Sequence, residues 1–441
     1  MHPLIAQITN LPSQDIGTNK INSFLPYRKG AKEFDFDAVG CSVLSCLMGR
    51  ELKRNYTFDK YKAECLKHLK EKLSDDSVLG AIEAMYFTHG TIAKTAPEFM
   101  LIRSQGKGNA STKHLISLFV GFCRGRSSQI KFDSGTNFIE KIFLGILNNN
   151  LQEGSYEASD ECYLPFVAES FYRDVTFLSK HPDYFLGQLS SCIELYTFIY
   201  CTQLGLNIRN WTGGEPPESK PLYFILDTEK ASSERSNLVK FGYQSVARPM
   251  SEVFPILSML EHFNNDVKFP KAPLWAFASS LRNASEQDQQ AALAALSAFA
   301  EVFRKKRALP AFPRPPMSAI EAMQQIVGYG IMQFAEGTGR FRVQTQYMDV
   351  FDKGVAKSFI QARGRAGKVL VVNQDFVLLL TNLSIGYRKS LRFQELLAEF
   401  RSRGFWFDKS SQQALISFYE RVGNVDRMSD SGDAVYVRNT I

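Results

Sequence analysis

An acidic stretch directly after an apolar run is the first place where this chain could do chemistry. The run at 222–226 is short enough to be a buried strand, and Asp227, Glu229 and Lys230 follow it. Metal-dependent nucleases hold Mg²⁺ with carboxylates at strand ends, and a lysine assists. Alternation along a strand would place that acid and lysine on one face, whereas Glu229 and Lys230 are adjacent and point apart. A metal-dependent nuclease site at Asp227 and Glu229 is therefore kept only as an alternative hypothesis.

Other catalytic patterns do not occur in the sequence. It contains neither GxxxxGK[ST] nor GxSxG, so we expect no nucleotide hydrolysis by this chain and no serine-hydrolase chemistry. The seven cysteines form no CxxC pair and the six histidines no HxH or HxxxH spacing, which argues against zinc. We therefore predict no catalytic residue, no metal and no cofactor, and we interpret the cysteines as buried free thiols.

Basic residues gather in two segments, although the formal net charge is only +7. Residues 302–317 hold five basic and no acidic residues, and 338–368 hold seven basic and two acidic residues. The first group closes a helix, and the helix dipole stabilises cations at that end. These side chains could therefore form a solvated face or contact phosphates. In the second group, small residues at 363–368 would let the backbone approach a phosphate chain. These segments predict contacts with double-stranded DNA.

The last 73 residues combine three helical patterns, at 375–384, 391–403 and 409–422, with two short runs flanking the turn-rich 429–433. Three short helices and a hairpin predict a winged helix, which commonly places one helix against nucleic acid. On 409–422 the polar face could read bases or, equally, bind a protein partner. The segment 369–441 has nine basic and eight acidic residues and an acidic tip, so we expect it to be a weak electrostatic anchor. The candidate DNA-binding residues are Arg304, Lys305, Lys306, Arg307, Arg340, Arg342, Arg363, Arg365, Lys368, Lys409, Gln412, Gln413, Arg427 and Arg438.

Apolar residues recur every three or four positions along most of the remaining chain, so we expect a mainly α fold. The predicted helices are 37–52, 57–73, 75–87, 111–124, 135–150, 164–177, 183–204, 232–239, 249–265 and 285–307, with a further helix opening at Ser318. We predict an N-terminal helical domain at 1–208, a central helical domain at 221–307 with one short strand, and a basic, proline-rich linker at 308–317. A C-terminal region at 318–441 would contain the basic segment and the winged helix at 369–441. The sequence contains no apolar run long enough to span a bilayer and no secretory signal, so we expect a soluble, cytoplasmic protein.

Several segments resemble the DptG family of DNA phosphorothioation-dependent restriction proteins, the G component of the Dpt/Dnd restriction system. They are 368–376 (KVLVVNQDF), 391–396 (LRFQEL), 403–408 (RGFWFD), 429–437 (SDSGDAVYV), 221–227 (PLYFILD) and 229–232 (EKAS). The resemblance implies a bacterial antiviral subunit that works with the F and H components, the latter a large ATPase. It also implies a complex that restricts DNA without sulfur in its backbone. The resemblance identifies no catalytic residue in this chain. We therefore expect a non-catalytic DNA-binding and assembly subunit, with a metal-dependent nuclease or a pure protein scaffold for the ATPase partners as alternatives.

Overall fold

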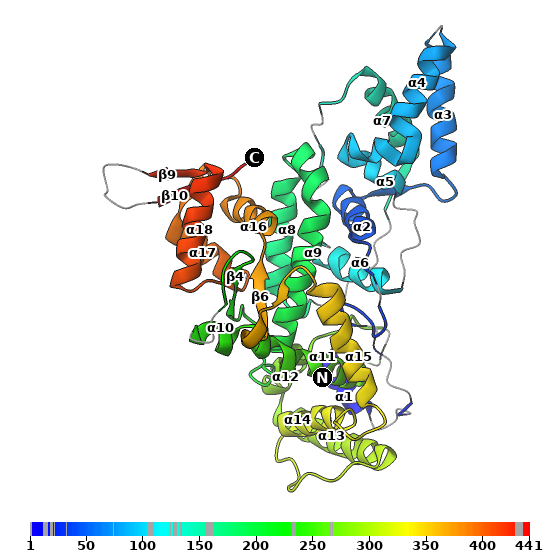
Figure 1. Ribbon diagram of the computed structural model, residues 1–441. Coiled ribbons are helices and arrows are strands. Elements are labelled where there is room, and N and C mark those ends of the chain that lie inside the picture. Colours follow the sequence, from blue (N-terminus) through cyan, green and yellow to red (C-terminus); the bar gives the residue numbers. More distant parts are fainter. Residues whose placement is uncertain are drawn as a thin grey trace.

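The computed structural model shows a mainly helical chain, as the sequence predicts (Figure 1). The described residues are 2–11, 16–17, 21, 23–31, 33–73, 75–103, 110–123, 125–126, 130–132, 135–154, 162–231, 235–264, 266, 268–427 and 435–441. Three groups of elements surround two long central helices: one at the upper right of the view, one at the bottom, and the C-terminal elements at the left.

The centre of the molecule is α9 (Pro182–Asn207), which is apolar around most of its circumference and buried along most of its length. A helix that is hydrophobic on every side must be surrounded by other elements. It packs against α8 (Pro165–Leu178), α2 (Phe36–Met48), α11 (Tyr243–Phe263) and α16 (Gln374–Ile385). One hydrophobic core therefore connects segments from both halves of the sequence.

The group at the upper right contains α3 (Phe58–Lys70), α4 (Asp76–Phe87) and α7 (Phe138–Asn149). It joins the centre through a strand pair, β1 (Arg50–Leu52) antiparallel to β2 (Leu151–Glu153). The helix predicted at 37–52 is thus too long: Gly49 adopts φ +64° and ends it, because glycine tolerates this left-handed conformation. The remaining elements here are η2 (Thr88–Lys94), η3 (Pro97–Phe99) and α5 (Met100–Arg103), while α6 (Ala110–Cys123) packs against α2 and α8 at the centre.

The group at the bottom is built around α13 (Glu286–Arg307) and α14 (Ala319–Met332), which pack on each other. Both begin as predicted, because the Ser285 and Ser318 side chains accept hydrogen bonds from first-turn backbone N–H groups. Around them lie α1 (Pro3–Thr9), α12 (Leu274–Arg282) and α15 (Phe341–Val350), none of which was predicted. In the proline-rich segment 308–317, Phe312 packs against Tyr329 of α14 with ring centroids 4.8 Å apart.

The apolar run at 222–226 is extended as predicted, but it pairs on two sides. Its first half, β3 (Leu222–Tyr223), is parallel to β8 (Phe405–Trp406). Its second half, β4 (Ile225–Leu226), is parallel to β6 (Lys368–Val372). β6 in turn pairs antiparallel with β5 (Ile360–Ala362), which follows the π-helical turn η4 (Phe351–Val355). The run therefore joins the C-terminal elements to the basic 338–368 segment.

The C-terminal elements follow in the order α16, β7 (Ser390–Arg392), α17 (Phe393–Ser402), β8, α18 (Lys409–Val422), β9 (Val425–Arg427) and β10 (Val435–Arg438). The three strands β7, β10 and β9 form an antiparallel sheet in that order. The predicted bounds of α18 are confirmed, while the acidic tip 429–433 lies outside the described residues. Val422, an apolar residue in the last turn of α18 before Gly423, is 42% exposed.

Two further expectations concern the state of the cysteines and the bounds of the helices α10 and α11. The cysteines are free, and all are buried except the half-buried Cys162. The helix predicted at 232–239 instead appears as α10 (Ser236–Phe241), with 232–234 outside the described residues, and α11 begins six residues before its predicted start. Within the described part of the chain, no helix combines the length and the apolar character needed to cross a bilayer.

Candidate nucleic-acid interface

The first basic cluster lies in the last turn of α13 and is largely used within the chain. Arg304 and Lys305 form ion pairs with Glu301 at 2.8 and 3.1 Å, and Arg304 also donates to the Leu309 carbonyl. Lys306 is exposed, and Arg307 donates to the Gly17 carbonyl at 2.6 Å. This arrangement agrees with the interpretation that these cations close the helix, where the helix dipole stabilises positive charge.

Arg340 and Arg342 flank the start of α15 and differ in their surroundings. Arg340 is half-buried and faces Arg307: burial, and then the charge of Arg340, lower the pKa of the Arg307 guanidinium. Arg342 is exposed, and the structure gives its side chain no partner among the described residues. Of this pair, Arg342 is the one available to an external phosphate.

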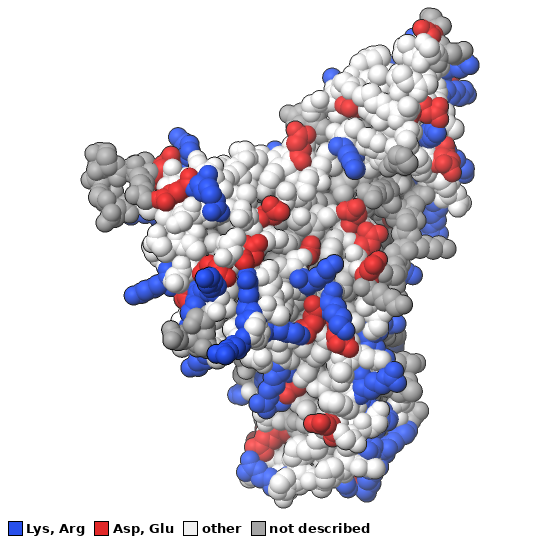
Figure 2. Space-filling model, in the orientation of Figure 1, with Lys and Arg blue, Asp and Glu red and all other residues white. Residues whose placement is uncertain are grey.

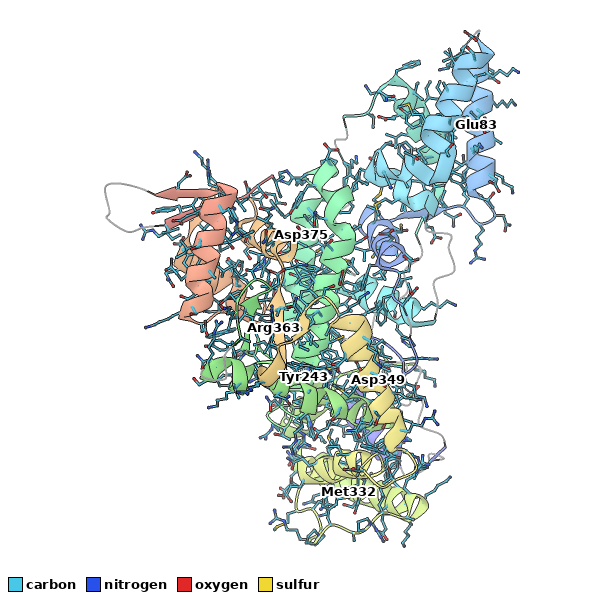
Figure 3. The ribbon with its side chains drawn as sticks, in the orientation of Figure 1. Glu83, Tyr243, Met332, Asp349, Arg363 and Asp375 are labelled. Carbon is cyan, nitrogen blue, oxygen red and sulfur yellow. The ribbon has the colours of Figure 1, made fainter. Side chains whose placement is uncertain are left out.

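Residues 363–367 connect β5 to β6, and two of the three cations at 363–368 are anchored. The Arg363 guanidinium donates to the backbone carbonyl of Asp227. The Lys368 Nζ lies 2.6 Å from Asp352 Oδ2 and 5.2 Å from the ring centroid of Tyr243, and the hydrogen bond to Asp352 raises the lysine pKa. Arg365 is exposed and has no such contact. Figure 3 shows Arg363 at the centre of this face, above Tyr243.

The polar face of α18 is only partly available. Lys409 and Gln413 are exposed, as the sequence predicts. Gln412 instead donates to the Phe407 carbonyl at 2.7 Å, so its amide N–H is used in holding the start of the helix. On β10, Arg438 pairs with Asp426 at 3.1 Å and donates to the Gly423 carbonyl, while Arg427 lies on β9 next to the undescribed tip. Gln412 and Arg438 are therefore weaker candidates than the sequence indicates.

A polar cluster that sequence reasoning missed holds the N-terminus of α18. Arg235 forms ion pairs with Glu229, at 3.0 Å, and with Asp408, and it donates to the Ser411 hydroxyl at 2.7 Å. The Ser411 hydroxyl also donates to Glu229 at 2.7 Å, and Asp408 caps the helix by accepting from the Ser411 N–H. Burial acts to raise the pKa of Asp408, but hydrogen bonds from Arg235 and Ser411 outweigh it and lower that pKa. No local signal could reveal this cluster, because Arg235 and Asp408 are 173 positions apart.

This cluster bears on the alternative acidic site. Glu229 is held by Arg235 and Ser411 and also accepts from the Leu226 N–H at 2.8 Å. The Asp227 backbone pairs with Val372 and Arg363, and one of its carboxylate oxygens is buried without a hydrogen-bond partner. Among the described residues, no group of three His, Cys, Asp or Glu side chains is arranged to hold a metal ion. The structure thus gives Glu229 a structural role at the start of α18.

Figure 2 shows Lys and Arg side chains gathered over the region of β4, β6, α10 and the upper end of α15. Acidic residues are interspersed there, including Asp349 and Asp352, which pair with Lys353 and Lys368. Four cations in the 338–368 segment and at the start of α18 are exposed without an ion pair among the described residues: Arg342, Lys357, Arg365 and Lys409. We call these four residues the exposed cation set.

Comparisons with known proteins do not add to this description. Neither a scan against protein-family models nor a search of curated proteins found a match to the chain.

Proposed function

We propose that this protein is a non-catalytic DNA-binding and assembly subunit of a phosphorothioation-dependent restriction complex. The proposal combines the resemblance of segments such as 368–376 and 403–408 to the DptG family with the basic surface described above. It places the protein in the bacterial cytoplasm, with double-stranded DNA and the F and H components as partners. The observation that carries its DNA-binding part is the exposed cation set, because unpaired surface cations gain most from replacing the counterions of a duplex.

The surface of β5, β6 and α15 would provide the main DNA contact, and α18 an additional one. We propose that 369–441 is a winged helix, since α16, α17 and α18 precede the β9–β10 hairpin and β7 completes a small sheet with it. In such modules the N-terminal residues of the third helix often contact base edges. Here Asp408, Ser411 and Gln412 are engaged within the chain, so Lys409 and Gln413 would supply the contacts of α18.

A salt titration of DNA binding by the full chain tests this proposal. If the exposed cation set neutralises about four phosphates, the affinity for a duplex should fall on the order of a hundredfold between 50 and 200 mM salt. Replacing Arg342 and Lys357 together with alanine should weaken binding and make the salt dependence shallower. Replacing Lys67 and Lys70 of α3 together with alanine is the matched control, because both are exposed cations outside this set and the change removes the same charge. An affinity that does not change with salt would refute DNA binding by this surface.

The pure scaffold is the second function that the site allows. The weak net charge of 369–441 and the intramolecular use of Gln412 favour protein docking by α18 over base reading. Co-expression with the F and H components, followed by pull-down, separates the two functions. A scaffold keeps its partners and the restriction activity when Arg342 and Arg365, which lie outside α18, are both changed to glutamate. A DNA-binding subunit keeps its partners but loses restriction after the same change.

A further inference from the structure

The turn between β5 and β6 forms a narrow, well-defined tip. Ala362 pairs with Lys368 in the antiparallel register, so residues 363–367 make the connection. The Arg363 N–H donates to the Gly367 carbonyl at 2.8 Å, and the Ala366 N–H donates to the Arg363 carbonyl at 3.0 Å, which close the neck of the turn. Gly364 and Gly367 have φ values of +53° and +70°, a conformation that glycine adopts without strain. The tip therefore has a fixed backbone and little side-chain bulk around Arg365.

The three cations of this turn have different roles. Arg363 is held at the base by the Asp227 carbonyl, and Lys368 by Asp352 and the ring of Tyr243. Both side chains are therefore held against the protein surface. Arg365, in the short helical turn Gly364–Ala366, is exposed and has no partner among the described residues. The surroundings of the tip are open, because a Cβ atom added at Gly364 or Gly367 would meet nothing within 4 Å.

We infer that this turn inserts the single guanidinium of Arg365 into the minor groove of a DNA duplex. The inference rests on the proposed DNA-binding function and specifies how the DNA is contacted. The minor groove of B-DNA is about 6 Å wide, too narrow for a helix but accessible to an arginine side chain on a slender turn. Narrow A·T-rich grooves have enhanced negative potential, and a guanidinium is more weakly hydrated than an ammonium, so it is transferred into the groove more easily. A surface that binds only phosphates would not distinguish A·T from G·C pairs, because phosphate contacts carry no direct sequence information.

Three duplexes of equal length, with A·T, I·C or G·C pairs at the centre, test the inference at one fixed salt concentration. I·C pairs keep the N7 and O6 acceptors that G·C presents in the major groove, but they lack the guanine 2-amino group in the minor groove. The wild-type full chain should bind the A·T and I·C duplexes about fivefold or more tightly than the G·C duplex. Arg365→Lys should reduce this preference to less than about twofold while retaining overall binding, since the charge is kept.

Lys357→Ala is the matched control, since Lys357 is an exposed cation of the same segment. It should weaken binding to all three duplexes by a similar factor and leave the preference intact. The unfolding midpoints of both variants should equal that of the wild type, since both side chains are exposed. An I·C duplex that behaves like G·C, or an Arg365→Lys variant that keeps the preference, would overturn minor-groove insertion while leaving DNA binding in place. Absence of binding to every duplex would refute the proposed function itself.

Discussion

Arg403 and Asp174 form a fully buried ion pair between segments that are 229 positions apart in the sequence. The guanidinium donates to both carboxylate oxygens, at 2.8 and 3.1 Å, and each side chain is 1% exposed. Tyr196 of α9 donates to the same carboxylate at 2.5 Å, and Glu399 accepts from Arg403 at 3.1 Å. The pair therefore attaches the end of α17 to the central helices α8 and α9, and it fixes the position of the C-terminal elements.

Replacing one partner of this pair should strongly destabilise the protein. In Arg403→Met the Asp174 carboxylate loses its buried bidentate partner and keeps only the half-exposed Arg173, whose Nε lies 3.5 Å away; this loss costs about 3–5 kcal/mol of unfolding free energy. The double variant Arg403→Met, Asp174→Leu removes both charges and should recover part of that loss. Urea unfolding followed by circular dichroism measures the three free energies. Arg421→Met, at an exposed arginine of α18, should stay within about 0.5 kcal/mol of the wild type. A single Arg403 variant as stable as this control would contradict the interpretation.

Arg235 should stabilise the folded conformation of the first turn of α18. Arg235→Met leaves Glu229 and Asp408 facing each other without the cation between them, and we expect a loss of about 2–4 kcal/mol. Hydrogen exchange should quicken at the backbone N–H of Ser411 and Gln412, while the centre of α9 keeps its protection. Glu229→Gln keeps an acceptor for Ser411 and should have the smaller effect. Equal acceleration throughout the chain would show that Arg235 acts on global stability alone.

Two glycines with nearly equal positive φ angles should respond differently to alanine. Gly214 and Gly337 have φ values of +84° and +85°. A Cβ atom at Gly337 would meet nothing within 4 Å, so Gly337→Ala should cost only the conformational strain, about 1–2 kcal/mol. At Gly214 it would lie 2.7 Å from the Ser279 Cα and 2.8 Å from its backbone nitrogen. Gly214→Ala should therefore cost about 1–3 kcal/mol more. Thermal unfolding of both variants checks the order, and equal midpoints would argue against the tight contact with α12.

His262 should make stability depend on pH in the weakly acidic range. Burial, followed by the charge of Arg307, lowers the pKa of this imidazole below its ordinary value of 6.5. The unfolded chain then binds a proton that the folded protein does not, so stability is full above pH 6.5 and falls as the pH drops toward the lowered pKa. His262→Gln should flatten this part of the profile, measured as unfolding free energy between pH 7.5 and the acid limit of folding. Burial also lowers the pKa of His114, so His114 should still contribute to the pH dependence of stability in this variant. An unchanged profile in the variant would exclude His262 as the source.

Local sequence patterns determined where the helices lie. Apolar spacing and the stop at Gly423 predict α18 at 409–422, and the cap residues Ser285 and Ser318 predict the starts of α13 and α14. These signals act within a few residues, because a helix needs one apolar stripe and a partner for its first N–H groups. The exception is α11, which continues through Pro249 and Pro255 because the surrounding tertiary core stabilises it despite the lost hydrogen bonds.

Only the tertiary structure decided which charged and polar residues remain available. The sequence shows Arg363, Lys368 and Gln412 as candidates equal to Arg365 and Lys409, yet the first three bind partners within the chain. The pairing of β4 with β6 and the cluster around Arg235 join segments separated by well over a hundred residues. No local pattern encodes such contacts, because they depend on which surfaces the packed core brings together. The sequence thus determined the elements and the location of positive charge, and folding selected the few cations that can face a partner.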